Sequence, residues 1–106
     1  MAGANPYAGE VEVVLDGVPH HARLTLGALA ALEGDLGAES LVALIERFEG
    51  GAFSTRDVLA VLIAGLRGGG WRGRSEDLLT VEIEGGPLAC ARAAAELIAR
   101  AFRITR

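Results

Sequence analysis

The 106-residue sequence has no lysine, a single cysteine and few aromatic residues. All ten basic residues are arginine, a bias that we attribute to a GC-rich coding sequence rather than to a function. With one cysteine the chain forms no internal disulfide, and the apolar surroundings of Cys90 in "PLACARAAAEL" favour a buried structural thiol over a reactive or metal-binding one. No uncharged stretch approaches the ~20 residues of a membrane-spanning helix. We therefore expect a soluble, cytoplasmic protein.

Residues with catalytic or metal-binding chemistry are also scarce. The two histidines, His20 and His21, are adjacent in a segment that we expect to be a strand, so they point to opposite faces and do not ligate one metal. Nothing in the sequence brings a histidine to Cys90 or to a serine, as a nucleophile and its base require. We expect no catalytic residue, no metal and no cofactor, and a protein that is not an enzyme.

Half of the residues are apolar, which is enough for one continuous core. We expect a flexible N-terminal arm over residues 1–9 and a single α+β domain over residues 10–106. The net charge is −4. Residues 1–52 carry two arginines and eight carboxylates, and residues 53–106 carry eight arginines and six carboxylates. Such asymmetry could align copies head to tail, but the basic excess is too small to favour a nucleic-acid surface.

The start of the domain has the pattern of a β-hairpin. In "EVEVVL", Glu10 to Leu15, apolar and acidic residues alternate as in a half-buried strand. Asp16-Gly17 is typical of a tight turn, and "HHARLTL" resumes an extended pattern. The sequence therefore predicts two antiparallel strands here.

Helical periodicity follows from Thr25 onward. The sequence predicts a first helix capped by Thr25, a second over residues 38–51, a buried third beginning after a Ser54–Asp57 capping box, and a last one over Pro87 to Phe102. Residues 75–84 fit either a short helix, which we favour, or a strand. The fold class is thus α+β, an N-terminal β-hairpin followed by a bundle of four to five helices. The apolar stripes expected on three of the helices are Leu26, Leu29, Leu32 and Leu36; Leu41, Leu44, Ile45 and Phe48; and Leu88, Ala91, Ala95, Ile98 and Phe102.

The segment "GLRGGGWRGRSED", residues 65–77, satisfies the spacing G-x-G-x-x-G through Gly68, Gly70 and Gly73. In dinucleotide-binding proteins those glycines follow a strand and open a helix, whereas here they follow a helix. We therefore interpret the segment as a helix stop and a flexible loop. The alternative is a partner-binding site made by Arg67, Trp71, Arg72 and Arg74, because tryptophan and arginine are enriched where interface energy concentrates.

Three blocks of the sequence, taken in order, resemble the small tail protein of gene transfer agents, which are phage-derived particles. The blocks are "GEVEVVLDGVPHHARLTLGALAALEGDLG", "GGAFSTRDVLAVLIAGLRGGG" and "AAAELIARAF". The resemblance runs from about residue 5 to residue 103 and is weakest over residues 71–86. It implies a role in building a tail, with no functional residue to carry over.

Three functional hypotheses follow, the first two from the resemblance and the third from the loop of residues 67–74. The first is a tail assembly chaperone that binds the tape-measure protein or tail-tube subunits. The second is a structural subunit of the tail tube that stays in the particle, although such subunits usually need a larger sheet than one hairpin. The third is a small regulatory or nucleic-acid-binding domain that uses residues 67–74. Copies of the chain itself are further expected partners.

Overall fold

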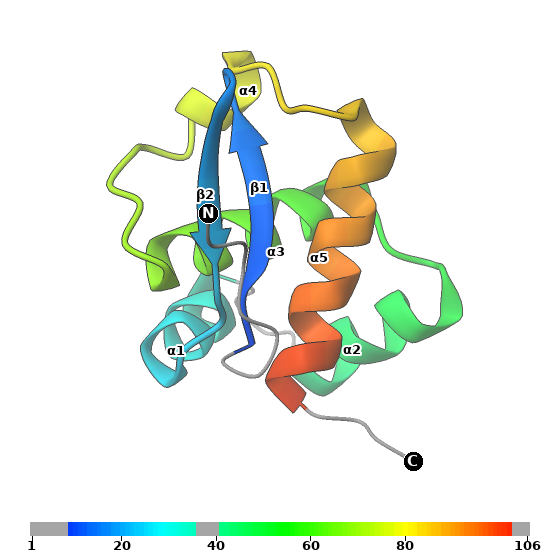
Figure 1. Cartoon of the computed structure of the whole chain (residues 1–106). Coiled ribbons are helices and arrows are strands. Elements are labelled where there is room, and N and C mark those ends of the chain that lie inside the picture. The colour runs from blue at the N-terminus through cyan, green and yellow to red at the C-terminus, as the bar shows by residue number, and fades with distance from the viewer. Residues whose placement is uncertain (1–8, 36–40, 103–106) are drawn as a thin grey trace.

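The computed structural model describes residues 9–35 and 41–102. The expected arm therefore lies almost wholly outside the described residues, as does Leu36. Two strands, β1 (Val11–Leu15) and β2 (Val18–Ala22), precede five helices: α1 (Leu26–Asp35), α2 (Leu41–Gly50), α3 (Thr55–Gly68), α4 (Asp77–Thr80) and α5 (Gly86–Phe102). Figure 1 shows the hairpin on one side of α3, with α1 and α5 to either side. The α+β class predicted from the sequence is confirmed.

The hairpin forms as its sequence predicts. Asp16 and Gly17 both have positive φ, 49° and 80°, as a two-residue turn between antiparallel strands requires. Val11 pairs with Ala22 and Leu15 with Val18. The alternation of β1 turns its odd-numbered apolar residues into the core, where they are 4 to 6% exposed: Val11, Val13 and Leu15.

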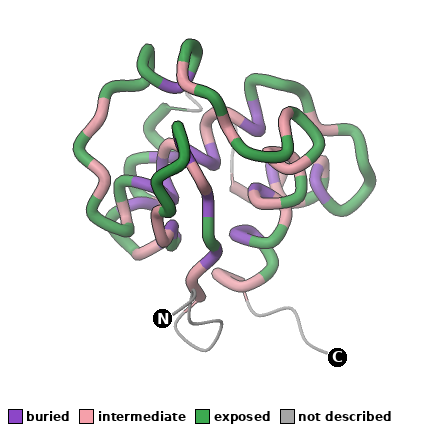
Figure 2. The backbone as a smooth tube through the Cα atoms, turned by 45° about the horizontal axis from the view of Figure 1, so that its top comes forward, coloured by how far each residue is buried: buried purple, intermediate pink, exposed green. Residues whose placement is uncertain are grey.

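Helix α3 is the centre of the molecule, and it packs against α1, α5 and β2. Val61, Leu62 and Leu66 on this helix are at most 1% exposed. In Figure 2 the buried residues lie mostly toward the inside of the molecule, and the exposed residues lie on its outer turns. The Leu97 side chain of α5 packs directly on Gly65, where an added Cβ would lie 2.7 Å from Leu97 Cδ1. The apolar run from Val58 to Leu66 thus forms the core against which the other elements pack.

Two expected apolar stripes are wrong at their first residue. Leu26 is 85% exposed and Leu88 is 63% exposed. Helix α1 faces the core through Ala28 and Leu32 instead, because Ala28 packs beside Gly68 of α3. Helix α5 faces it through its middle, at Ala94, Leu97 and Ile98. The stripe of α2 is confirmed: Leu44 and Phe48 are buried, and Leu41 and Ile45 pack at the edge of the core.

The ambiguous residues 75–84 contain the short helix that we favoured, and Ile83 makes a single isolated bridge to Leu15 rather than a strand. Helix α4 has four residues, and the chain then turns extended beside β1. Glu84 N donates to Val14 O (3.1 Å) and Asp16 N donates to Glu82 O (2.8 Å). The segment after α4 thereby covers the outer edge of β1 near the hairpin turn. None of the described helices is long and apolar enough to span a membrane.

Candidate functional site

The glycines of residues 65–77 end a helix. Gly70 has a φ of 103°, Gly70 N donates to Arg67 O (3.0 Å), and Trp71 N donates to Leu66 O (2.9 Å). These two bonds form the Schellman motif that closes α3. Gly68 lies so close to the hairpin that an added Cβ would be 2.0 Å from the Arg23 carbonyl oxygen. The spacing that suggested a phosphate loop is therefore explained by helix termination and close packing.

The four residues proposed for partner binding are not equally accessible. Arg67, Arg72 and Arg74 are exposed, whereas Trp71 is half-buried and packs against the edge of the core. The indole ring also lies against Gly73, where an added Cβ would be 2.1 Å from Trp71 Cζ2. The arginine side chains are thus available to a partner, while the tryptophan mainly supports the loop that carries them.

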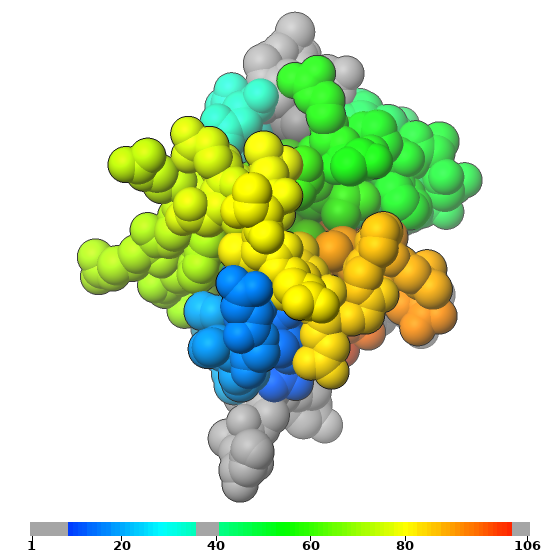
Figure 3. Space-filling model, turned by 90° about the horizontal axis from the view of Figure 1, so that it is seen from above, coloured from blue at the N-terminus to red at the C-terminus, as the bar shows by residue number. Residues whose placement is uncertain are grey.

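One concave site is a groove that the sequence analysis missed. It is an open groove of about 800 Å³ between the first half of α3, α4, residues 81–86 and the start of α5. Figure 3 looks down on this end of the molecule, where residues 76–85 in yellow border both a green region that includes the start of α3 and the start of α5 in orange. The lining is mostly apolar and includes Phe53, Val58, Leu59, Leu62, Leu78, Leu79, Ile83 and Cys90.

The groove stays open because α4 is too short to cover α3. Leu78 of α4 is buried, but the next residue, Leu79, lines the groove and is 68% exposed. In the segment that follows, Val81 and Ile83 are half-buried while Glu82 and Glu84 are exposed. This alternation places two carboxylates on the rim of an apolar groove. In the sequence, the alternating "VEIE" after a short helix was the only signal for this groove and its acidic rim.

Cys90 lies in this groove rather than in the core. It is half-buried, and burial raises the pKa of its thiol. The expected buried structural thiol is therefore only partly enclosed. No histidine lines the groove: His20 lines a separate hollow beside Trp71, and His21 Nδ1 lies 3.5 Å from Glu10 Oε1. Within the described residues, no three His, Cys, Asp or Glu side chains gather as a metal site.

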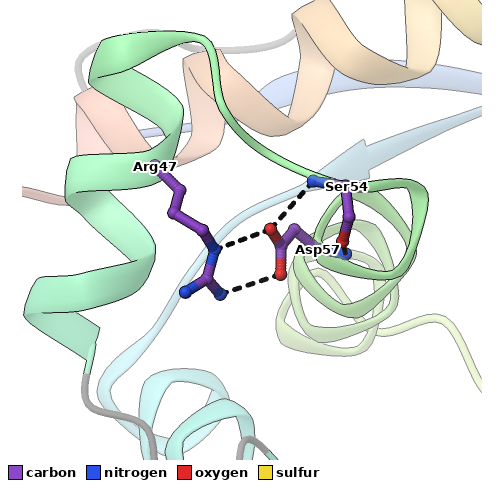
Figure 4. A network of polar contacts seen from close by, with 3 residues as sticks. All are labelled: Arg47, Ser54 and Asp57. Atoms are coloured by element: carbon purple, nitrogen blue, oxygen red, sulfur yellow. Dashed lines mark hydrogen bonds and ion pairs between the residues drawn. The ribbon is translucent and has the colours of Figure 1, made fainter.

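A polar network beside the groove fixes α2 to the start of α3. Arg47 donates twice to Asp57, from Nε to Oδ2 (2.8 Å) and from an Nη nitrogen to Oδ1 (2.9 Å). Ser54 N donates to Asp57 Oδ2 (2.9 Å), and Asp57 N donates to Ser54 Oγ (3.1 Å), which completes the predicted capping box. Figure 4 shows the three residues converging between the two helices.

The charge state of this network follows from its contacts. The hydrogen bonds from Arg47 lower the pKa of Asp57 below its ordinary value of 3.8, and the bond from the Ser54 backbone acts in the same direction. Burial of Asp57 opposes them. A carboxylate held this firmly by a bidentate guanidinium serves to join two helices. It does not have the raised pKa of a general acid.

One comparison with known proteins gives a match. A family model described as "Phage tail tube protein, GTA-gp10" matches residues 8–104. The match spans both strands and all five helices. No curated protein and no solved structure matches the chain.

Proposed function

Because the chain belongs to the gene transfer agent tail family described as phage tail tube protein, GTA-gp10, we propose that it is a non-enzymatic component in the building of a phage-type tail. The family match over residues 8–104 is the observation that carries this proposal. An open apolar groove with no gathered catalytic set among its lining residues fits work done by protein contact. Its place of action would be the cytoplasm during assembly and then the tail of the particle.

Two roles fit this proposal. The description of the family supports a tube subunit that stays in the finished particle. A second role, a tail assembly chaperone that binds the tape-measure protein or tube subunits and then leaves, is supported by the groove. Leu79 and the half-buried residues beside it offer an apolar surface of the kind that takes the apolar face of a helix. Particle composition separates the two: a tube subunit is present in stoichiometric amounts, and a chaperone is absent.

The sheet also bears on the two roles. Among the described residues the only sheet is the two-stranded hairpin, and one edge of it is covered by residues 82–84. In a ring wall that is built by extending sheets from subunit to subunit, each subunit needs open sheet edges, and the described hairpin offers few. A tube-subunit role would therefore rely on side-chain surfaces such as the groove.

The test is co-expression of the tagged chain with a tape-measure protein and with a tail-tube subunit of a gene transfer agent. We expect a complex that survives purification and that Leu79→Asp weakens, because a charge would enter the apolar groove. Val42→Asp is the matched control, since Val42 is 62% exposed on α2 and does not line the groove. Absence of any complex with both proteins would count against the proposal.

A nucleic-acid-binding role for Arg67 to Arg74 remains the third hypothesis. It predicts retention of DNA or RNA on a filter at low salt, with affinity that falls steeply as salt rises. Retention that is lost in Arg72→Glu/Arg74→Glu would favour it over the tail role. Lack of retention at low salt would remove it.

A further inference from the structure

We propose that the hollow beside Trp71 binds an arginine side chain of another tail protein. This Trp71 hollow has a volume of about 470 Å³, and its lining includes Leu15, Asp16, Val18, His20, Trp71 and Asp77. It is separate from the groove, and Val81 lines both. The inference rests on the proposed function for the kind of partner. It goes beyond that function by naming a second contact site and the chemistry that the site recognises.

The Trp71 hollow lies over a part of the hairpin that the core leaves uncovered. Val13 and Leu15 of β1 turn into the core and are 4% and 5% exposed. His20 and Val18 pair with them across the hairpin and so lie on the same face of the sheet. Val18 is nevertheless 54% exposed, because the hollow separates it from the loop that runs from α3 to α4 (Figure 1). An apolar part of the sheet is thus left for the stem of a partner's side chain.

Another wall of the hollow is the indole ring of Trp71. Trp71 N donates to Leu66 O (2.9 Å), and the ring packs on Gly73, where an added Cβ would collide with it. The ring is therefore held in place before a partner arrives. Because Trp71 is only half-buried, part of its surface faces the hollow. Tryptophan is the aromatic residue that attracts a cation most strongly, and a planar guanidinium group stacks on its ring.

The Trp71 hollow also carries negative charge. Asp16 comes from the hairpin turn and Asp77 from the start of α4, and both are exposed. Asp16 Oδ1 accepts a hydrogen bond from Glu82 N (2.9 Å). Asp77 Oδ2 accepts one from Arg74 N (2.9 Å). Neither carboxylate has an ion-pair partner among the residues that the structure describes, so each keeps an oxygen for a guanidinium group.

These three features together select arginine. Its stem packs on apolar surface such as Val18, while its flat head stacks on an indole and pairs with carboxylates. The compact, strongly hydrated head of lysine gains less from the ring. Arg72 and Arg74 follow Trp71 in the chain but are exposed and do not line the hollow. Within the described part of the chain no other arginine lines it either, so a partner has to supply this group.

The first experiment uses Trp71, the only tryptophan of the chain, as the reporter. Blocked tripeptides with arginine, lysine or citrulline at the centre are titrated into the purified chain at about pH 8, above the range in which histidines become charged. Citrulline has the shape of arginine without its charge. We expect the arginine peptide to quench Trp71 fluorescence saturably and the lysine peptide to bind about threefold less tightly. The citrulline peptide should not bind.

Asp16→Asn/Asp77→Asn removes the two charges of the hollow and keeps its hydrogen bonds. Asparagine retains an oxygen that accepts from Glu82 N and Arg74 N, and it tolerates the positive φ of residue 16. The dissociation constant of the arginine peptide should rise about tenfold, because two exposed ion pairs are lost. Glu82→Gln/Glu84→Gln is the matched control, since it removes the same charge from exposed residues that line the groove and not the hollow. Circular dichroism verifies that each variant is folded.

The inference is overturned by a lack of saturable quenching, or by a citrulline peptide that binds as tightly as the arginine peptide. It is also overturned if the control variant weakens binding as much as Asp16→Asn/Asp77→Asn does. A lysine peptide that binds equally well would overturn the choice of arginine.

The second experiment repeats the co-expression test of the proposed function with Asp16→Asn/Asp77→Asn. We expect this variant to yield less complex than the parent chain, and excess arginine peptide to compete with the partner. A complex that the variant leaves unchanged would overturn the inference. A chain that forms the complex but binds no arginine peptide would overturn it while leaving the proposed function intact. A chain that binds the peptide but forms no complex would support the site and count against the proposed function.

Discussion

At the scale of single residues, burial and charge act against each other at Asp57. Its side chain is 10% exposed, a position where an unpaired carboxylate would be strongly unfavourable. Arg47 and the Ser54 backbone supply three hydrogen bonds that keep it ionised. Because its pKa is lower in the folded chain than its ordinary 3.8, Asp57 stabilises the fold at neutral pH. That contribution is lost as the pH falls through the folded-state pKa.

Asp57→Asn should therefore lower the free energy of unfolding by about 2 kcal/mol at pH 7. This is less than for a fully buried pair, because the Arg47 side chain is 27% exposed. Urea unfolding of both proteins from pH 7 to pH 2 is the measurement. The difference between them should be constant above about pH 5 and should shrink below pH 4. Glu46→Gln is the control, and a difference that does not change with pH would contradict the assignment.

Gly68 shows a second constraint at the same scale. An added Cβ would be 2.0 Å from the Arg23 carbonyl oxygen, and that backbone is held in place by the hairpin. Gly68→Ala should thus lower the free energy of unfolding by about 2 kcal/mol. In Gly34→Ala the methyl group meets nothing within 4 Å, so helix propensity should raise stability by up to about 1 kcal/mol. Thermal unfolding of both variants is the measurement: the melting temperature should fall in Gly68→Ala and rise in Gly34→Ala.

At the scale of elements, the hairpin is protected against adding further strands. Val14 faces Pro19 across the hairpin, and the Val14 carbonyl turns outward to Glu84. In an antiparallel pair, two residues that face each other both direct their backbone N and O either toward or away from the partner strand. Because the Val14 carbonyl points away from β2, the backbone of Pro19 points away from β1. Proline has no N–H, so this edge of β2 lacks a donor at Pro19, and Gly69 packs against the His21 carbonyl oxygen near its end. Partners are thereby directed to side-chain surfaces such as the groove.

Pro19→Thr should restore that donor and increase association through the sheet edge. We expect light scattering at high protein concentration to rise relative to the parent chain, and to do so equally at low and high salt. Val18→Thr is the control, because the backbone of Val18 turns inward to Leu15 across the turn. Equal scattering from the two variants would show that the edge is already closed by other means.

At the scale of the whole molecule, strands and helices share one core. Buried residues from β1, β2 and all five helices belong to a single apolar cluster, with Leu62 and Leu97 fully buried within it. The single domain expected over residues 10–106 thus predicts one cooperative unfolding step. Urea unfolding followed by Trp71 fluorescence and by circular dichroism should give the same midpoint. Separate midpoints would show that the loop after α3 unfolds on its own.

The sequence by itself determined the local elements and the family. Alternation in "EVEVVL", the Asp16-Gly17 turn and the Ser54–Asp57 capping box each depend on neighbours in the chain, and each is present in the structure. The helix stop expected at or near Gly68 was readable for the same reason, and α3 ends at that residue. The family rests on the order of such local patterns along the whole chain.

Only the tertiary structure decided which surfaces are open. Leu26 and Leu88 follow helical spacing, yet they are exposed, because Ala28 and Leu97 set the rotation of α1 and α5 against glycines of α3. The groove depends on a four-residue helix failing to cover α3. Periodicity reports how one element repeats, but exposure depends on distant residues that pack against it.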